Sequence, residues 1–205
     1  MSDFDYERTM RAVFEAVNAD DIADGISNLI KFCRVEAPAD AALWDDLARR
    51  DFAADYVLFR DDFGGNLKAS PIPAKYTGLY FGLDGLNMPN GKGIEFGCSD
   101  TFDDTKDDGD VSWAYDGSHY PFEIASPLLS ELYDGVVQMA SLADHAVCIA
   151  YVGLAVRDAL RELPISDTLG TARARAVCWG PHDGDLYRLG TLRPSGLDLD
   201  CTWRW

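Results

Sequence analysis

Apolar residues recur at helical spacing through the first 50 residues of the chain. The first stripe has the i, i+3, i+4, i+7 pattern of one helix face and consists of Met10, Val13, Phe14 and Val17. A second stripe begins after the Asp20-Asp21 pair and is interrupted at Glu36-Ala37-Pro38. A third follows Asp40, whose side chain can cap a helix N-terminus. This spacing predicts three helices.

From about residue 55 the apolar period changes to two, which is typical of strands. The strand-like segments are residues 56–60, 76–81 and 93–98, together with the alternating residues Val111, Trp113 and Tyr115. Residues 61–66 combine aspartates with two glycines, as turns do. These features predict an antiparallel meander with tight turns between its strands.

Two helices and then further strands are predicted in the second half of the chain. Ser126-Pro127 combines a hydroxyl N-cap with proline at the first helical position. Another helical stripe runs over residues 152–163 and ends at Pro164, and residues 145–151 before it fit either a strand or an extra helical turn. Alternating residues then follow from position 173, with a turn at Asp183-Gly184 and a last strand carrying apolar residues from position 197 to 205.

The order of helices, strands, helices and strands predicts an α+β fold with mainly antiparallel pairing. We expect N-terminal helices, a β meander, two central helices and C-terminal β hairpins. A single domain is expected over residues 1–205, helical over 1–52 and 126–164 and β-rich over 53–122 and 172–205. At 205 residues, the chain can bury an adequate core without disulfides or metals.

Acidic residues far exceed basic ones, 35 against 18, so the formal net charge is -17. Such a field repels nucleic acid and anionic membrane surfaces, and attracts a basic protein. The five cysteines are scattered and form no CxxC pair. The N-terminus lacks the pattern of a signal peptide, and no apolar run reaches the roughly 20 residues of a membrane-spanning helix. We therefore expect a cytoplasmic protein with free thiols and neither nucleic acid nor membrane as a partner.

The densest charge lies in residues 100–110, called the aspartate segment below. It places six aspartates around one lysine: Asp100, Asp103, Asp104, Asp107, Asp108 and Asp110 around Lys106. Burying unpaired charges is costly, so these carboxylates must face water, a metal ion or a cationic partner.

Aromatic residues follow directly after the aspartate segment, at Trp113, Tyr115 and Tyr120. Aromatic anchors beside a charged rim concentrate binding energy at protein interfaces. We predict that they form a partner-binding surface together with the six aspartates. The alternative is that Trp113 and Tyr115 are half core and half sheet surface.

No catalytic or cofactor motif in the sequence fits the chemistry that it would require. An EF-hand loop starting at Asp104 would place Lys106 among the ligands and Tyr115 at the closing carboxylate position. Cys178 and His182 lie close in sequence, but on a strand running into a turn they meet only if the loop folds back. No catalytic residue, metal ligand or cofactor is assigned, and weak cation binding by the aspartate segment stays open.

At the level of class, a small, acidic, cytosolic α+β chain without catalytic motifs resembles bacterial immunity or inhibitor proteins, which neutralise a toxin by covering its site. The resemblance implies a protein that captures and neutralises a basic protein partner, such as a toxin domain. The alternative is an enzyme, either a hydrolase using Cys178 and His182 or a metal-dependent enzyme using the aspartate segment.

Overall fold

A computed structural model describes residues 5–83, 92–103, 105, 111–115, 119–136, 142–181 and 185–201. The helices are α1 (Tyr6–Val17), α2 (Ile22–Glu36), α3 (Ala41–Leu47), α4 (Phe52–Ala69), α5 (Pro127–Val136), α6 (Leu142–Glu162) and α7 (Ile165–Thr168), with short 3₁₀ turns η1 (Pro38–Asp40) and η2 (Ser112–Ala114). The strands are β1 (Gly78–Leu83), β2 (Lys92–Ser99), β3 (His119–Ala125), β4 (Arg175–Pro181), β5 (Tyr187–Arg193) and β6 (Gly196–Leu199). The predicted α+β fold is confirmed.

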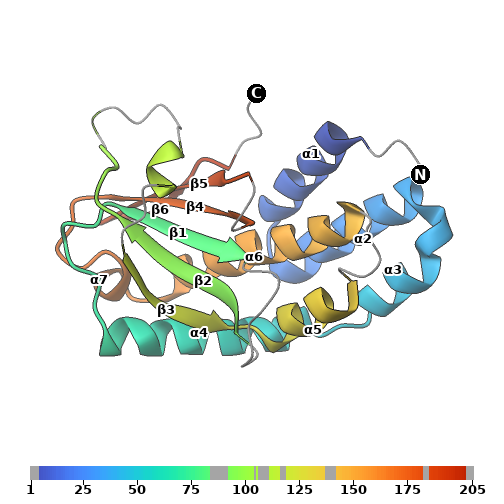
Figure 1. Ribbon diagram of the computed structural model, residues 1–205, viewed down its shortest axis with the longest axis horizontal. Helices are drawn as coiled ribbons and strands as arrows, with labels where there is room; N and C mark the ends of the chain where they lie inside the picture. Colours follow the sequence, from blue (N-terminus) through green and yellow to red (C-terminus); the bar gives the residue numbers. More distant parts are fainter. Residues whose placement is uncertain are drawn as a thin grey trace.

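The sheet has six strands in the order β3-β2-β1-β4-β5-β6 (Figure 1). All neighbouring strands are antiparallel except β1 and β4, which pair in parallel from Gly78↔Ala176 to Leu83↔Pro181. The sheet is therefore a β1–β3 meander and a β4–β6 pair of hairpins joined at their first strands. A parallel pair needs a long crossover connection, which the intervening helices α5, α6 and α7 provide.

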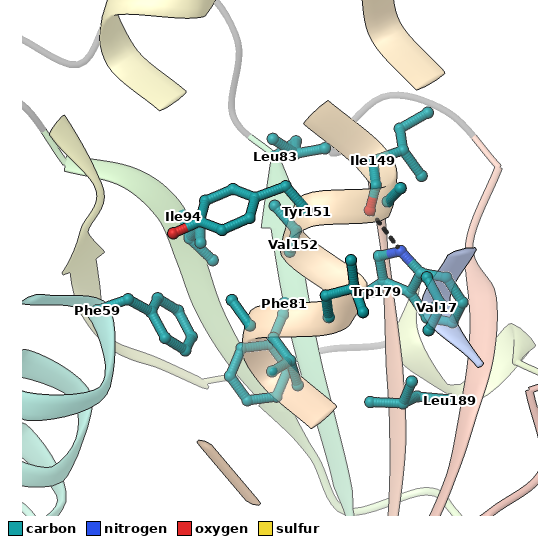
Figure 2. Close-up of a cluster of buried hydrophobic side chains, with 14 of the residues drawn as sticks. Val17, Phe59, Phe81, Leu83, Ile94, Ile149, Tyr151, Val152, Trp179 and Leu189 are labelled. Atoms are coloured by element: carbon teal, nitrogen blue, oxygen red, sulfur yellow. Dashed lines mark hydrogen bonds between the residues drawn. The ribbon is translucent and has the colours of Figure 1, made fainter. Parts of the chain in front are cut away.

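The inner face of the sheet packs against α6, whose residues 146–157 are all buried. Its residues Val147, Tyr151 and Val152 are completely inaccessible, and it contacts α1, α2 and α4 as well as the sheet. Figure 2 shows the junction with β4, where the Trp179 indole N–H donates to the Ile149 carbonyl at 3.0 Å. A side chain at Gly153 would collide with the Trp179 ring, so the glycine permits this close approach.

The β3–α5 junction is held by two carboxylates of α4. Asp62 accepts a hydrogen bond from the Ala125 amide at 2.9 Å. Asp55, which is 5% exposed, accepts from the Ser126 hydroxyl at 2.6 Å and from the Leu128 amide at 2.9 Å. The predicted helix start at Ser126-Pro127 is confirmed. The hydrogen bond from the Leu129 amide to the Ser126 hydroxyl is long, at 3.4 Å, so the Asp55 carboxylate of α4 provides most of the capping.

Two fully buried arginines donate hydrogen bonds to backbone carbonyl groups of segments that are distant in sequence. Arg157 on α6 donates to the carbonyls of Val17 and Ala19 at the end of α1, and to the Asp158 carboxylate. Arg175 on β4 donates to the carbonyls of Ile72 and Leu169, and burial lowers the pKa of its guanidinium. Each arginine satisfies backbone acceptors that the core would otherwise leave unpaired.

The strand predicted at residues 56–60 and the turn predicted at 61–66 are wrong, because both belong to the 18-residue helix α4. Its buried residues Tyr56, Phe59, Phe63 and Leu67 are three or four positions apart, a period that a five-residue window cannot separate from a strand. The glycine at position 64 allows α4 to pack closely against Leu163, since a Cβ there would lie 2.8 Å from Leu163 Cδ2.

The strand predicted for Val111, Trp113 and Tyr115 is also wrong, because Ser112–Ala114 form the 3₁₀ turn η2. Its hydrogen bonds run from the Ala114 amide to the Val111 carbonyl and from the Tyr115 amide to the Ser112 carbonyl. Residues 145–151 belong to helix α6 rather than to a strand. The last strand, β6, ends at Leu199, and the predicted turn at Asp183-Gly184 and residues 202–205 lie outside the described residues.

Substituting Asp55 by asparagine should lower the free energy of unfolding by about 2–4 kcal/mol, because three buried donors lose a charged acceptor. Urea denaturation followed by circular dichroism measures the change. Asp61→Asn on the same helix is the control, since its exposed pair with Arg60 should contribute less than about 0.5 kcal/mol. Equal midpoints for the two variants would show that the buried carboxylate is not important for stability.

Candidate partner-binding surface

Phe102, near the start of the aspartate segment, and Trp113, just after it, are anchored on the outer face of the sheet, the face opposite to α6. The Thr77 hydroxyl donates to the Phe102 carbonyl at 2.8 Å, and the Phe102 ring meets Trp113 edge-on at 5.8 Å. The buried side chains of this contact are Tyr80, Phe102, Trp113, Ala114, Ala176 and Cys178. The anchors thus form a second, smaller hydrophobic cluster.

Small residues on the outer face make room for these anchors. A Cβ at position 78 of β1 would lie 2.3 Å from Trp113 Cε3, so only glycine allows the indole to lie on the strand. Next to it, Arg188 of β5 places its guanidinium 5.2 Å from the centre of the Phe102 ring and donates to the Thr191 hydroxyl at 2.8 Å. A cation over an aromatic face is attracted by the ring quadrupole, which adds to the hydrophobic anchoring of Phe102.

The described carboxylates of the aspartate segment face solvent. Asp100 and Asp103 are both exposed, on either side of the buried Phe102. Asp103 also accepts hydrogen bonds from the Thr105 amide at 3.0 Å and the Thr105 hydroxyl at 2.6 Å, which holds its carboxylate in a local turn. The charged groups therefore stand beside a fixed hydrophobic anchor.

The predicted aromatic residues divide between core and surface. Trp113 is 6% exposed and Tyr115 is 61% exposed, so the half-core, half-surface alternative describes them, although on a 3₁₀ turn rather than a strand. Trp113 supports the segment from beneath, and Tyr115 is accessible to a partner. Tyr120 has its backbone in β3, and its side chain lies outside the described residues, as do Asp104, Asp107, Asp108 and Asp110.

A group of residues that the sequence did not single out adjoins Tyr115. The Tyr6 hydroxyl of α1 donates to the Asp185 carboxylate at 2.6 Å and lies 3.1 Å from the Tyr187 hydroxyl. Burial raises the pKa of Tyr187, and nearby Tyr6, Asp185 and Tyr115 act in the same direction. No sequence signal joins residues 179 positions apart, so only the fold brings Tyr6 and Asp185 together.

Cys178 lies in an environment that opposes nucleophilic chemistry. Its side chain is inaccessible, and burial raises the pKa of the thiol well above its ordinary value despite the nearby Arg188. A nucleophilic cysteine instead needs an accessible sulfur with a lowered pKa. His182, its predicted partner in the hydrolase alternative, lies outside the described residues.

Other candidate chemistry is limited in the part of the chain that the structure describes. Within those residues, no group of three or more histidine, cysteine, aspartate or glutamate side chains is placed to hold a metal ion. His119 is stacked on Tyr76 with ring centres 5.0 Å apart, a contact that accounts for its position on β3. No helix among the described residues is both long and apolar enough to cross a membrane.

Comparison with protein-family models, curated proteins and solved structures finds no match to this chain. The function must therefore be inferred from its own residues.

All five cysteines should resist alkylation in the folded protein. Each is buried, and burial raises the pKa of the Cys98 and Cys201 thiols to about 12, so thiolate is scarce at neutral pH. Mass spectrometry after treatment with iodoacetamide should find unmodified native protein, and five adducts after unfolding in urea. Rapid, selective modification of Cys178 in the native protein would instead support the hydrolase.

Proposed function

We propose that this protein captures and neutralises a basic protein partner, in the manner of a bacterial immunity or toxin-inhibitor protein. The observation that supports the proposal is the anchoring of the aspartate segment: Phe102 and Trp113 are buried on the outer face, while Asp100 and Asp103 beside Phe102 are exposed. Carboxylates that flank a buried anchor, as Asp100 and Asp103 flank Phe102, lose less conformational entropy on binding. More of the favourable contact energy therefore remains in the free energy of binding.

Charge determines the kind of partner that this surface favours. The chain carries a net charge of -17, and the exposed Asp185 extends the acidic surface beyond the aspartate segment. Such a field accelerates association with a basic protein and slows association with acidic ones. A basic toxin domain fits this requirement, and the five free, buried thiols suit a cytoplasmic setting, which we propose as its site of action.

The exposed aromatic residues provide the short-range part of the interaction. Tyr115 is largely accessible, and Tyr6 is half-buried with its hydroxyl bonded to Asp185. Tyrosines of this kind supply large contact areas at low entropic cost and are enriched among the residues that dominate interface energies. An arginine or lysine of the partner could contact the Tyr115 ring and the Asp185 carboxylate together.

The burial of Cys178 favours this proposal over a cysteine hydrolase. A thiol without access to solvent cannot reach a substrate unless β4 and its covering residues separate. The metal-dependent alternative, which uses the aspartate segment, stays a prediction.

Removing four charges from the aspartate segment should slow association by about tenfold and flatten its salt dependence, because electrostatic steering is reduced. The variant combines Asp103→Asn, Asp104→Asn, Asp107→Asn and Asp108→Asn. The partner is first captured from a lysate of the native organism at low salt and identified by mass spectrometry. Stopped-flow mixing of the purified proteins at about 50 to 200 mM salt then measures the association rate.

A second variant with the same change in net charge provides the control. It combines Glu15→Gln, Asp20→Asn, Asp24→Asn and Asp198→Asn, all at exposed positions outside the proposed surface. If both variants slow association equally, net charge alone is responsible and the aspartate segment is not the binding surface. Unchanged rates in the first variant would also contradict the proposal.

Tyr115→Ala should speed dissociation of the complex by about tenfold or more while leaving the association rate nearly unchanged. Its stability should not change, since the side chain is 61% exposed. Val35→Ala, which removes an apolar side chain that is 72% exposed on α2, is the matched control. Surface plasmon resonance separates the two rates, and equal dissociation of both variants and the unaltered protein would exclude Tyr115 as an anchor.

A further inference from the structure

A pocket lies between α2 and the segment that joins α3 to α4, away from the aspartate segment. Its volume is about 270 Å³. In Figure 1, α2 and α3 lie side by side at the right, and α4 begins near them and runs below the sheet. The cavity is slightly smaller than the roughly 300–1,000 Å³ typical of small-molecule sites, so a small ligand would fit it.

The floor of the pocket is apolar. It is formed by Ile26 and Ile30 of α2, Leu47 of α3 and Phe52 at the start of α4, each of which is at most 6% exposed. The same residues belong to the main hydrophobic core, so the floor is held in place by packing from behind. A ligand with a short apolar group would cover this surface and displace water from it.

The rim of the pocket is cationic, although the chain as a whole is strongly acidic. Lys31, Arg34 and Arg50 line it, and Asp51 is the only carboxylate in the lining. Asp51 is already engaged, because its carboxylate accepts the Ala54 amide at 2.9 Å as the N-cap of α4. The pocket lining therefore carries three cationic side chains and one carboxylate, in a protein with a net charge of -17.

Ion pairs orient two of the rim cations from outside the pocket. Arg34 contacts Asp45 at 2.6 Å, and Arg50 contacts Asp46 and Glu131, each at 2.9 Å. Lys31 differs, since the hydrogen bond found for its ammonium is to the neutral Asn28 side chain at 3.3 Å. The start of the 18-residue helix α4 adds the positive end of a helix dipole to the same rim.

We infer that this pocket binds a small organic anion, a carboxylate carrying a short aliphatic or aromatic group. The apolar floor accepts the hydrocarbon part, and the Lys31 ammonium at the rim binds the carboxylate, while Arg34 and Arg50 are already paired with Asp45, Asp46 and Glu131. The site is separate from the proposed partner-binding surface, so neither assignment depends on the other.

Benzoate is a suitable probe, because it combines a carboxylate with one ring. Its addition to isotope-labelled protein should cause saturable shifts of the Ala53 and Ala48 amide signals, with a dissociation constant of about 1 mM for so small a ligand. Benzamide has the same shape without the charge and should bind at least about fivefold more weakly. Equal binding of the two compounds, or no saturable shift at about 20 mM benzoate, would overturn the inference.

Three variants locate the binding. Lys31→Gln should weaken benzoate binding by about fivefold, and Lys68→Gln, which removes an exposed lysine in the last turn of α4, should leave it unchanged. Ser27→Trp places a large ring in the pocket from an exposed position and should abolish the shifts while the other amide signals persist. Equal affinities of the Lys31 and Lys68 variants, or full binding by the Ser27 variant, would exclude this pocket as the site.

Discussion

The packing of the helices depends on the hydrogen bonds that the buried Asp55 carboxylate accepts. It joins three elements, because it lies on α4, accepts hydrogen bonds at the start of α5, and accepts the Tyr151 hydroxyl of α6 at 2.7 Å. Its neighbour Asp62 fixes the last residue of β3 to the same helix. The chain can turn from the edge of the sheet into the crossover helices only where these acceptors satisfy its backbone amides.

The two faces of the sheet carry different side chains and have different roles. The inner face carries Phe81, Phe96 and Trp179, which fill the space in front of α6. On the outer face, Gly78 leaves room for the Trp113 ring. A side chain at position 78 would displace the Trp113 ring, which packs against Phe102. The packing of one small cluster thus places charged residues at the surface, in an arrangement that suits recognition of a basic partner.

The distribution of charge separates two possible binding regions. Carboxylates are exposed beside Phe102 and near Tyr115, whereas Lys31, Arg34 and Arg50 gather around a pocket of the helical layer. A basic partner would be attracted to the first region, and the Lys31 ammonium would bind an anion in the second. A protein partner on the first region and a small anion in the second would therefore not compete directly.

The sequence alone determined most of what depends on local pattern. The α+β order, the helices before residue 50, the Ser126-Pro127 helix start and the antiparallel strands are each encoded within a few neighbouring residues. Four features were decided only by tertiary packing. Residues 56–60 are helical because Tyr56 and Phe59 are buried at a helical period that extends to Leu67. Trp113 lies in a 3₁₀ turn because Gly78 leaves room for its ring. The contact between Tyr6 and Asp185 and the group of cations around the pocket both join residues that are separated in sequence. Chain topology makes these residues neighbours, and no local pattern contains that information.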